Sequence, residues 1–123
     1  MRTILIVDDS PTIRRMVAAS LQSLDGIILA EASNGLEAIE MLAREQPALV
    51  VLDLNMPDMH GLEVLRFIRA HNQYRGIPVI VLTTKYDVDT RKDALDNGAS
   101  QYMTKPFDPA ALRQNVSTLL KLK

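Results

Sequence analysis

The sequence predicts an α/β fold, (βα)₅, in which an open, doubly wound, five-stranded parallel sheet carries helices on both faces. Two observations predict it. Short runs rich in β-branched residues alternate along the chain with longer segments of helical periodicity, and strict alternation gives a parallel sheet with crossover helices. Three of the runs (ILIV, LVVLD and VIVLT) are almost continuously apolar, as expected of central strands buried on both faces. Five strands are too few for the eight-stranded barrel, so the open sheet is left.

The five predicted strands follow the apolar runs. They cover residues 3–7, 27–32, 49–53, 79–83 and 101–104. The second and fifth are shorter or more polar than the others. We therefore expect these two at the edges of the sheet.

Capping residues mark the helices between the strands. Ser10 and Pro11 begin the first helix, and Gly26 is expected to end it. The other helices are predicted from Asn34 to about Arg44 with Glu37 as a capping-box partner, from Gly61 to about Ala70, from Asp87 to Asn97, and from Asp108 onward. Apolar residues at helical spacing are expected to face the core. They are Ile13, Met16, Val17, Leu21 and Leu24, then Ile39 and Leu42, Leu62, Leu65 and Ile68, Val88, Ala94 and Leu95, and finally Leu112, Val116, Leu119 and Leu120.

Composition limits the class of protein. The 123 residues have room for one domain with its own hydrophobic core. The absence of cysteine excludes disulfides and thiolate metal sites, and is compatible with a reducing cytoplasm, our expected location. No apolar run approaches the roughly 18 residues of a membrane span. Lys and Arg (14) nearly balance Asp and Glu (15), so the basic charge typical of nucleic-acid binding is absent.

The carboxyl ends of the predicted strands carry side chains that can support chemistry. Ligands of an open parallel sheet bind beside these ends. The first strand ends in Asp8 and Asp9, the third in Asp53 and the fourth in Thr83 and Thr84, while the fifth runs into Lys105. Taken alone, each of these residues is better explained as a cap, a strand-forming residue or a loop charge. Together they converge on one crevice. The second strand ends near Glu31, for which the sequence suggests no role.

Three converging carboxylates repel one another, since two unit charges about 4 Å apart cost about 4 kcal/mol at an effective dielectric near 20. The group Asp8, Asp9 and Asp53 is tolerable if it binds a divalent cation, pairs with Lys105, or both. All-oxygen ligation favours Mg²⁺, with Mn²⁺ as a substitute, over zinc. Such a site suits phosphoryl transfer, with Asp53 as the nucleophile and Lys105 and the ion neutralising the transferred group. Thr83 would donate its hydroxyl to a phosphoryl oxygen.

At this point the residues resemble the receiver domain of two-component response regulators, in the single-domain form found in chemotaxis. The resemblance covers the whole chain, 1–123, as one domain. It rests on Asp8-Asp9-Ser10, the segment DLNMPDMHG around Asp53, Thr83-Thr84, and Lys105-Pro106-Phe107. It implies a flavodoxin-like fold with strand order 2-1-3-4-5. It also implies that a histidine kinase, or a small phosphodonor, phosphorylates Asp53, and that the protein catalyses only its own phosphoryl transfer and dephosphorylation.

The resemblance also implies a metal site. Asp9 and Asp53 would bind Mg²⁺ through their side chains, and Asn55 through its main-chain carbonyl. Asp8 would act mainly through a metal-bound water. Lys105 would pair with Asp53 and later with the phosphoryl group, next to a cis peptide bond to Pro106, which costs about 0.5–1 kcal/mol before proline.

A switch and a set of lifetime-tuning positions follow from the same resemblance. The hydroxyl of Thr83 would move to the phosphoryl oxygen, and the ring of Tyr102 would turn into the space it leaves. Thr84 is a departure, because this position is usually alanine or another small residue in the family. A bulkier polar group there is expected to slow the access of donors or water. Asn55 and Lys85 flank the phosphoryl site, and we expect Lys85 to change its hydrolysis rate.

The resemblance further implies a face that carries the signal. It would comprise the helix from Asp87 to Asn97, the strand with Tyr102, and the helix from Asp108 to Leu120, and it includes Lys85, Tyr86, Arg91 and Lys92. We expect a protein partner there, with the chain monomeric and dimerisation left open. His60 and His71 are isolated, and we interpret them as surface or capping residues.

Other readings of the sequence are less consistent with its residues. In a flavin-binding protein of this topology, Asp8 and Asp9 would repel the cofactor's phosphate. An aspartate-nucleophile phosphatase usually has a second aspartate two residues after the first, where this chain has Asn55. A receiver that acts without phosphate would not need the full set of acids with Thr83 and Lys105. Within the receiver interpretation, a chemotaxis regulator, a phosphorelay intermediate and a receiver cut from a longer regulator stay open.

Overall fold

The computed structural model describes residues 1–84 and 87–122. Strands and helices alternate throughout that range. In order they are β1 (Arg2–Val7), α1 (Pro11–Leu21), β2 (Ile27–Ala32), α2 (Gly35–Glu45), β3 (Leu49–Leu52), α3 (Gly61–Ala70), β4 (Val79–Thr83), α4 (Val88–Asp96), β5 (Gln101–Thr104) and α5 (Pro109–Leu120). The predicted (βα)₅ architecture is therefore confirmed.

The five strands form one parallel sheet in the order β2-β1-β3-β4-β5. This order confirms the one that the family resemblance implied, and it places β2 and β5 at the edges, as their more polar sequences predicted. All four residues of β3 and all five of β4 are buried. Strands of this kind need a cover on both faces, because either face left in water would expose apolar side chains.

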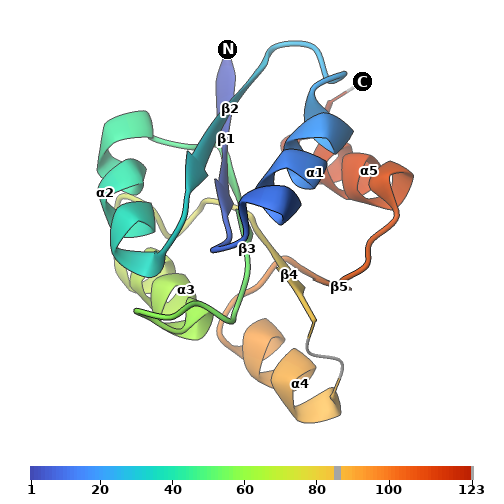
Figure 1. The fold of residues 1–123 in the computed structure, drawn as a ribbon. Helices are drawn as coiled ribbons and strands as arrows, with labels where there is room; N and C mark the ends of the chain where they lie inside the picture. The colour runs from blue at the N-terminus through green and yellow to red at the C-terminus, as the bar shows by residue number, and fades with distance from the viewer. Residues whose placement is uncertain (85–86, 123) are drawn as a thin grey trace.

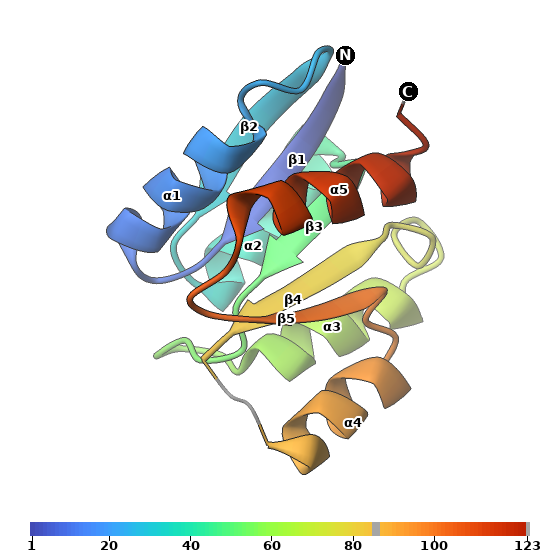
Figure 2. The ribbon, with the colours of Figure 1, turned by 90° about the vertical axis from the view of Figure 1, so that its right-hand side faces the viewer.

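Helices supply that cover in two layers. α1 and α5 lie side by side on one face, and α2, α3 and α4 lie on the other (Figures 1 and 2). Two separate apolar clusters result. One contains Ile4, Ile6, Val17 and Leu112 with their neighbours, and the other contains Leu5, Val7, Leu42 and Ile68 with theirs. Successive residues of β1 thus alternate between the two clusters, as the period of two in a strand requires.

The predicted caps begin the helices. A side-chain oxygen accepts a hydrogen bond from a backbone N–H of the first turn at Ser10, Asn34, Asp87 and Asp108. Glu37 departs slightly from a capping box, because its carboxylate accepts from the N–H of Ser33 (3.0 Å) and not from that of Asn34. The two histidines both lie at helix ends, as predicted. His60 caps the start of α3, where its Nδ1 accepts from the N–H of Leu62 (3.1 Å), and His71 is at the end of that helix.

Two expectations about α1 are wrong. The helix ends at Leu21 and not at Gly26. A turn follows in which the N–H of Leu24 donates to the carbonyl of Leu21 (3.0 Å), and Gly26, with φ of +76°, serves the entry into β2. Met16 is 47% exposed, because Val17 beside it occupies the inward position of the helical stripe.

The expected inner face of α4 is also wrong in part. Ala94 is buried, but Val88 is 80% and Leu95 is 40% exposed. Val88 and Leu95 are two helical turns apart and share a face, which is rotated by about 100° from Ala94 because the helix has 3.6 residues per turn. Ala94 is therefore the one buried residue of Val88–Asp96 that anchors this helix to the core.

Candidate functional site

The three predicted carboxylates come together where β1 and β3 end. β1 leads directly into Asp8 and Asp9. β3 ends at Leu52, one residue earlier than predicted, and the N–H of Asp53 still donates to the carbonyl of Val7 (2.9 Å). One carboxylate oxygen from each of Asp8, Asp9 and Asp53 lies within 4.8 Å of the others. Asp8 and Asp53 are buried and Asp9 is exposed, so the group opens to solvent on one side.

Lys105 enters this group from the end of β5. Its Nζ lies 2.5 Å from Oδ2 of Asp8 and 3.6 Å from Oδ1 of Asp53. Asp8 is thus the nearer partner, and its other oxygen accepts the backbone N–H of Ser10 (2.9 Å). The expected cis peptide bond between Lys105 and Pro106 is present.

The electrostatics of Asp53 show that this group of side chains has too little positive charge. Burial raises the pKa of its carboxyl above the ordinary value of 3.8, and the negative charge of Asp8 raises it further. Lys105 and a hydrogen bond from the backbone N–H of Asn55 oppose the rise, while Asp9 adds to it. One lysine among three acids leaves a surplus of negative charge. All-oxygen donors with this surplus fit Mg²⁺, which keeps several waters and needs only a few protein ligands.

The predicted switch residues lie on neighbouring strands. Thr83 is fully buried at the end of β4 and is paired in register with Thr104 of β5. Tyr102 is half-buried and packs against the apolar cluster that contains Leu5 and Ile68. Burial and the charge of Asp87 raise the pKa of its hydroxyl, and Arg91 opposes this, which places the phenol near the start of α4. Thr84 is exposed, and the predictions for Lys85 and Tyr86 lie outside the described residues.

The loop after Asp53 passes unusually close to the start of α3. The N–H of Gly61 donates to the carbonyl of Leu54 (2.8 Å). A Cβ atom on Gly61 would lie 2.3 Å from the carbonyl oxygen of Asp53 and 2.6 Å from Cα of Leu54. Only glycine allows this approach, so Gly61, the predicted start of a helix, also lets that helix lie against the backbone of Asp53 and Leu54.

Arg14 contacts Asp8, and the sequence did not suggest this contact. From α1, its Nη1 donates to the main-chain carbonyl of Asp8 (2.6 Å), and its Nε pairs with Glu31 (2.8 Å). Glu31, the strand-end residue without a predicted role, therefore orients a side chain that binds the β1–α1 loop. This contact depends on the register of the edge strand, in which Glu31 lies opposite Ile6. The sequence does not show that register, so the contact could not be predicted from it.

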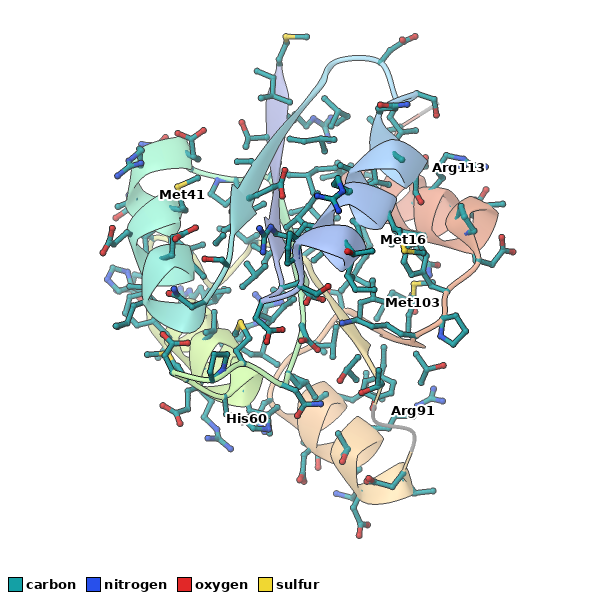
Figure 3. The ribbon with its side chains drawn as sticks, in the orientation of Figure 1. Met16, Met41, His60, Arg91, Met103 and Arg113 are labelled. Atoms are coloured by element: carbon teal, nitrogen blue, oxygen red, sulfur yellow. The ribbon has the colours of Figure 1, made fainter. Side chains whose placement is uncertain are left out.

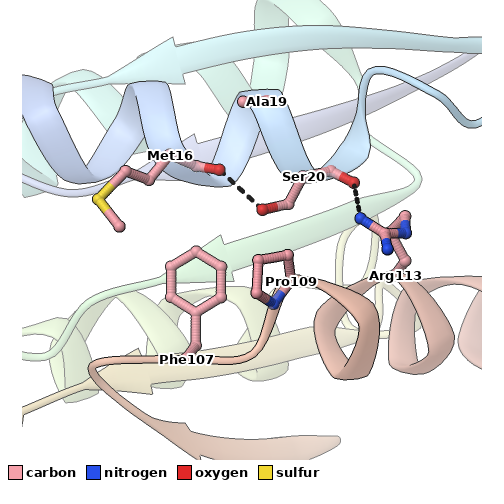
Figure 4. Close-up of a pocket in the computed structure, with 6 residues that line it drawn as sticks. All are labelled: Met16, Ala19, Ser20, Phe107, Pro109 and Arg113. Carbon is pink, nitrogen blue, oxygen red and sulfur yellow. Dashed lines mark hydrogen bonds between the residues drawn. The ribbon is translucent and has the colours of Figure 1, made fainter.

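An apolar surface borders the site. One pocket of about 380 Å³ is lined by Ile13, Met16, Thr84, Lys105, Pro106 and Phe107. It adjoins a second, of about 290 Å³, between α1 and α5 (Figure 4), which shares Met16 and Phe107 and ends at Arg113. There Ser20 donates to the carbonyl of Met16 (2.8 Å), and Arg113 donates to the carbonyl of Ser20 (3.3 Å). Figure 3 shows Met16 and Arg113 on the side of the molecule where these two helices lie. The exposed side chain of Met16 thus lines both of these pockets.

A second apolar surface lies on α4. Val88 and Leu95 line a shallow pocket of about 300 Å³ together with Arg91, Lys92 and Asp96. Tyr102 lies near the start of this helix. Within residues 1–84 and 87–122, no helix is long and apolar enough to cross a membrane.

Comparison with known proteins assigns the family. The response regulator receiver domain model matches residues 4–117. Chemotaxis protein CheY1 of Helicobacter pylori (strain J99) is 36% identical over 118 residues, which are 95% of each chain. The probable transcriptional regulatory protein TcrX of Mycobacterium tuberculosis is 39% identical over 119 residues, but these are 97% of this chain and only 50% of TcrX.

Solved structures agree. A putative response regulator from Chloroflexus aurantiacus superimposes with a TM-score of 0.91 at 28% identity, covering 98% of both chains. Chemotaxis protein CheY4 of Vibrio cholerae superimposes with a TM-score of 0.88 at 32% identity, covering 97% of this chain and 98% of CheY4. The matched span includes the acidic group, Thr83 and Lys105. The chain belongs to the response regulator receiver domain family.

Proposed function

We propose that this protein is a phosphorylation-dependent signalling switch, with residues 1–123 as one receiver domain acting in the cytoplasm. A histidine kinase, or a small phosphodonor, transfers a phosphoryl group to Asp53 in a Mg²⁺-dependent reaction. The modified protein then controls a protein partner. The observation that carries the proposal is the convergence of Asp8, Asp9, Asp53 and Lys105 at the carboxyl ends of parallel strands.

The metal site proposed from the sequence fits the donors present. Asp9 and Asp53 supply carboxylate oxygens, and Asn55 supplies its main-chain carbonyl. Both oxygens of Asp8 already have partners, namely Lys105 and the N–H of Ser10, which supports a role through a metal-bound water. When bound, Mg²⁺ (or Mn²⁺) supplies positive charge to the phosphoryl oxygens.

Asp53 is the nucleophile. Its carboxylate oxygen attacks the phosphorus of a phosphohistidine, the P–N bond breaks with its electron pair going to the imidazole, and an acyl phosphate forms. Lys105 is 3.6 Å from Asp53, within reach of an oxygen of the arriving group. A carboxylate that is ionised needs no general base, so charge neutralisation and positioning are what the site contributes. Attack of water on the acyl phosphate reverses the modification.

The apolar surface around Met16 and Phe107 is the contact we assign to the donor. It adjoins Lys105, so a protein seated there places its own histidine at the open side of the acidic group. Burial of exposed apolar side chains such as Met16 would stabilise that encounter complex. The donor and the output partner then use different surfaces.

The output face is assigned to α4, β5 with Tyr102, and α5, as proposed from the sequence. Val88 and Leu95 add to that proposal, because they give α4 exposed apolar side chains near its start and its end. Thr83 and Tyr102 would report the state of Asp53 to this face, and Asn55, Thr84 and Lys85 would set how long the state lasts. Chemotaxis is the output suggested by the names of the CheY relatives, transcription control by those of the longer ones, and the two stay open with the relay alternative.

The proposal is tested with acetyl phosphate. Wild-type protein incubated with acetyl phosphate and Mg²⁺ should gain one phosphoryl group, mapped by mass spectrometry to the peptide that contains Asp53. EDTA should prevent the gain. Lys105→Met should slow it by about 100-fold, the usual cost of losing one charge-stabilising donor. The matched control Lys121→Met, which removes an exposed lysine at the end of α5, should react like the wild type. An adduct on another residue, or none in the presence of Mg²⁺, would overturn the assignment.

A change of state should be measurable in α4. This helix has one buried residue, Ala94, whereas α3 has four, so a small free-energy change is enough to alter its opening. We expect amides of residues 87–97 to exchange about tenfold more slowly in the beryllofluoride-bound form, a difference of about 1.4 kcal/mol. Amides of α3 serve as the internal control. Equal exchange of residues 87–97 in both forms would contradict a switch at this face.

A further inference from the structure

Asp58 links the loop after β3 to the start of α2. One of its oxygens accepts the backbone N–H of Gly35 and the other accepts that of Leu36, both at 3.0 Å. These are free donors of the first turn of α2, which carry the positive end of the helix dipole. Both bonds lower the pKa of the Asp58 carboxyl, so its ionised form is the one held. The two elements are more than twenty residues apart in the chain.

A second contact holds the same two elements together. A Cβ atom on Gly35 would lie 2.6 Å from Cβ of Met59, so the backbone of α2 is as close to this loop as a glycine allows. The loop is also closed at its two ends, where the N–H of Gly61 donates to the carbonyl of Leu54. It is therefore tied at both ends and clamped once between them, at Asp58 and Met59.

Asn55 lies between these points of attachment. Its backbone N–H donates to the carboxylate of Asp53, and its carbonyl is the third protein ligand in the metal site proposed above. The peptide units on either side of Asn55 must therefore be held in one orientation for both contacts. Asp58 is itself exposed and does not belong to the acidic group.

We propose that Asp58 is a positioning residue for the metal site: by binding the N-terminus of α2, it holds the loop so that the Asn55 carbonyl faces the ion. This inference rests on the proposed function, since it assumes that the site binds Mg²⁺. It predicts that Asp58 affects the affinity for Mg²⁺ and not the reaction once the ion is bound. It also predicts that the effect reaches Asn55 in the metal-free protein.

The test measures the Kd for Mg²⁺ by isothermal titration calorimetry in wild type, Asp58→Asn and Asp58→Ala. Loss of a group that orients a metal ligand commonly weakens metal binding by tenfold or more, so Asp58→Ala should raise the Kd by about tenfold. Asp58→Asn keeps one acceptor oxygen and should fall between the two. At saturating Mg²⁺, all three should be phosphorylated by acetyl phosphate at the same rate.

Two control variants separate positioning from other effects. Asn34→Ala removes the N-cap of α2 and leaves Asp58 in place, so it reports what a weaker helix start does alone. Glu63→Gln makes the same change in net charge as Asp58→Asn, in the first turn of α3. Neither control should change the Kd by more than about twofold, well below the tenfold cost expected for a lost ligand-orienting group. In the metal-free form, the amide resonance of Asn55 should shift in the Asp58 variants and stay in place in both controls.

The outcomes are distinguishable. If wild-type protein binds no Mg²⁺, the proposed function fails. If wild type binds Mg²⁺ and Asp58→Ala binds it equally well, the positioning role is wrong while the proposed function stands. A Kd for Asn34→Ala as weak as that of Asp58→Ala would also overturn positioning, because loss of the helix start would then explain the effect.

Discussion

Asp53→Asn is expected to make the metal-free protein more stable while abolishing its phosphorylation. The amide has no negative charge and is a far weaker nucleophile, so acetyl phosphate should add nothing at this position. It is also nearly the same size as the carboxylate, so the buried packing around it is preserved. At neutral pH we expect a gain of about 1–2 kcal/mol in the free energy of unfolding, the range typical of removing strain from a functional site.

The gain follows from the raised pKa of Asp53. Burial and Asp8 disfavour its ionised form in the folded protein, so ionisation at neutral pH reduces stability. When the pH falls through the raised value toward 3.8, the folded protein takes up a proton before the unfolded chain does, and the penalty disappears. The difference between variant and wild type should therefore be largest near pH 7 and shrink to zero as the pH falls below 3.8.

Urea denaturation with EDTA present, at several pH values, measures this difference. Tyrosine emission or circular dichroism must be the probe, because the chain has no tryptophan. Mg²⁺ should reverse the order, since it binds folded wild type and adds stability that the variant lacks. A variant that is less stable than wild type near neutral pH without Mg²⁺ would contradict a repulsive acidic group. A phosphoryl adduct on Asp53→Asn would contradict Asp53 as the acceptor.

Gly61→Ala should be the most destabilising single-methyl change at this site. Its Cβ would lie 2.3 Å from the backbone carbonyl oxygen of Asp53, and because the backbone fixes the position of a Cβ, no side-chain rotation can relieve the contact. Relief requires the loop and the start of α3 to separate, which also breaks the hydrogen bond to Leu54. Overpacking of this kind costs about 3 kcal/mol, and a domain of this size would lose roughly 10 °C in Tm. Differential scanning calorimetry measures the loss.

Gly76→Ala is the matched control. A Cβ at Gly76 has nothing within 4 Å, and its φ is not in the left-handed region, so the same methyl group should change stability by less than about 1 kcal/mol. We also expect Gly61→Ala to weaken Mg²⁺ binding, because displacement of the loop moves Asp53 and Asn55 together. Equal stability of the two alanine variants would show that the loop gives way without cost, and that Gly61 does not set its position.

Much of this molecule could be predicted from local patterns. Three central strands are recognisable because burial on both faces leaves no room for polar residues. Four of the helix starts are recognisable because a cap is a contact between residues two or three apart. The convergence of Asp8, Asp9, Asp53 and Lys105 could be predicted from the sequence, since parallel strands place their carboxyl ends at one edge. The structure confirms that Lys105 reaches two of the acids, and it adds that Asp8 is the nearer one.

What could not be predicted depends on contacts between distant elements. Asp58 is in a Pro-Asp turn, where a local role is the natural interpretation, and its bonds to Gly35 and Leu36 exist only after α2 has packed beside the loop. Helical periodicity overestimated the inner face of α4, because the apolar residues Val88 and Leu95 lie on its exposed side. The inward position of α1 was also uncertain from the sequence, because Met16 and Val17 are adjacent apolar residues and only one of them can face the core.

The pairing of one lysine with three carboxylates has a consequence for which ions the crevice accepts. When all three acids are ionised, the four side chains carry a net charge of −2, and one divalent cation cancels it. With a monovalent ion the site keeps a net negative charge, and with a trivalent ion it gains a net positive charge. Either net charge is costly beside buried groups. Discrimination against Na⁺ and K⁺ therefore begins with valence, before ionic radius or coordination number has any effect.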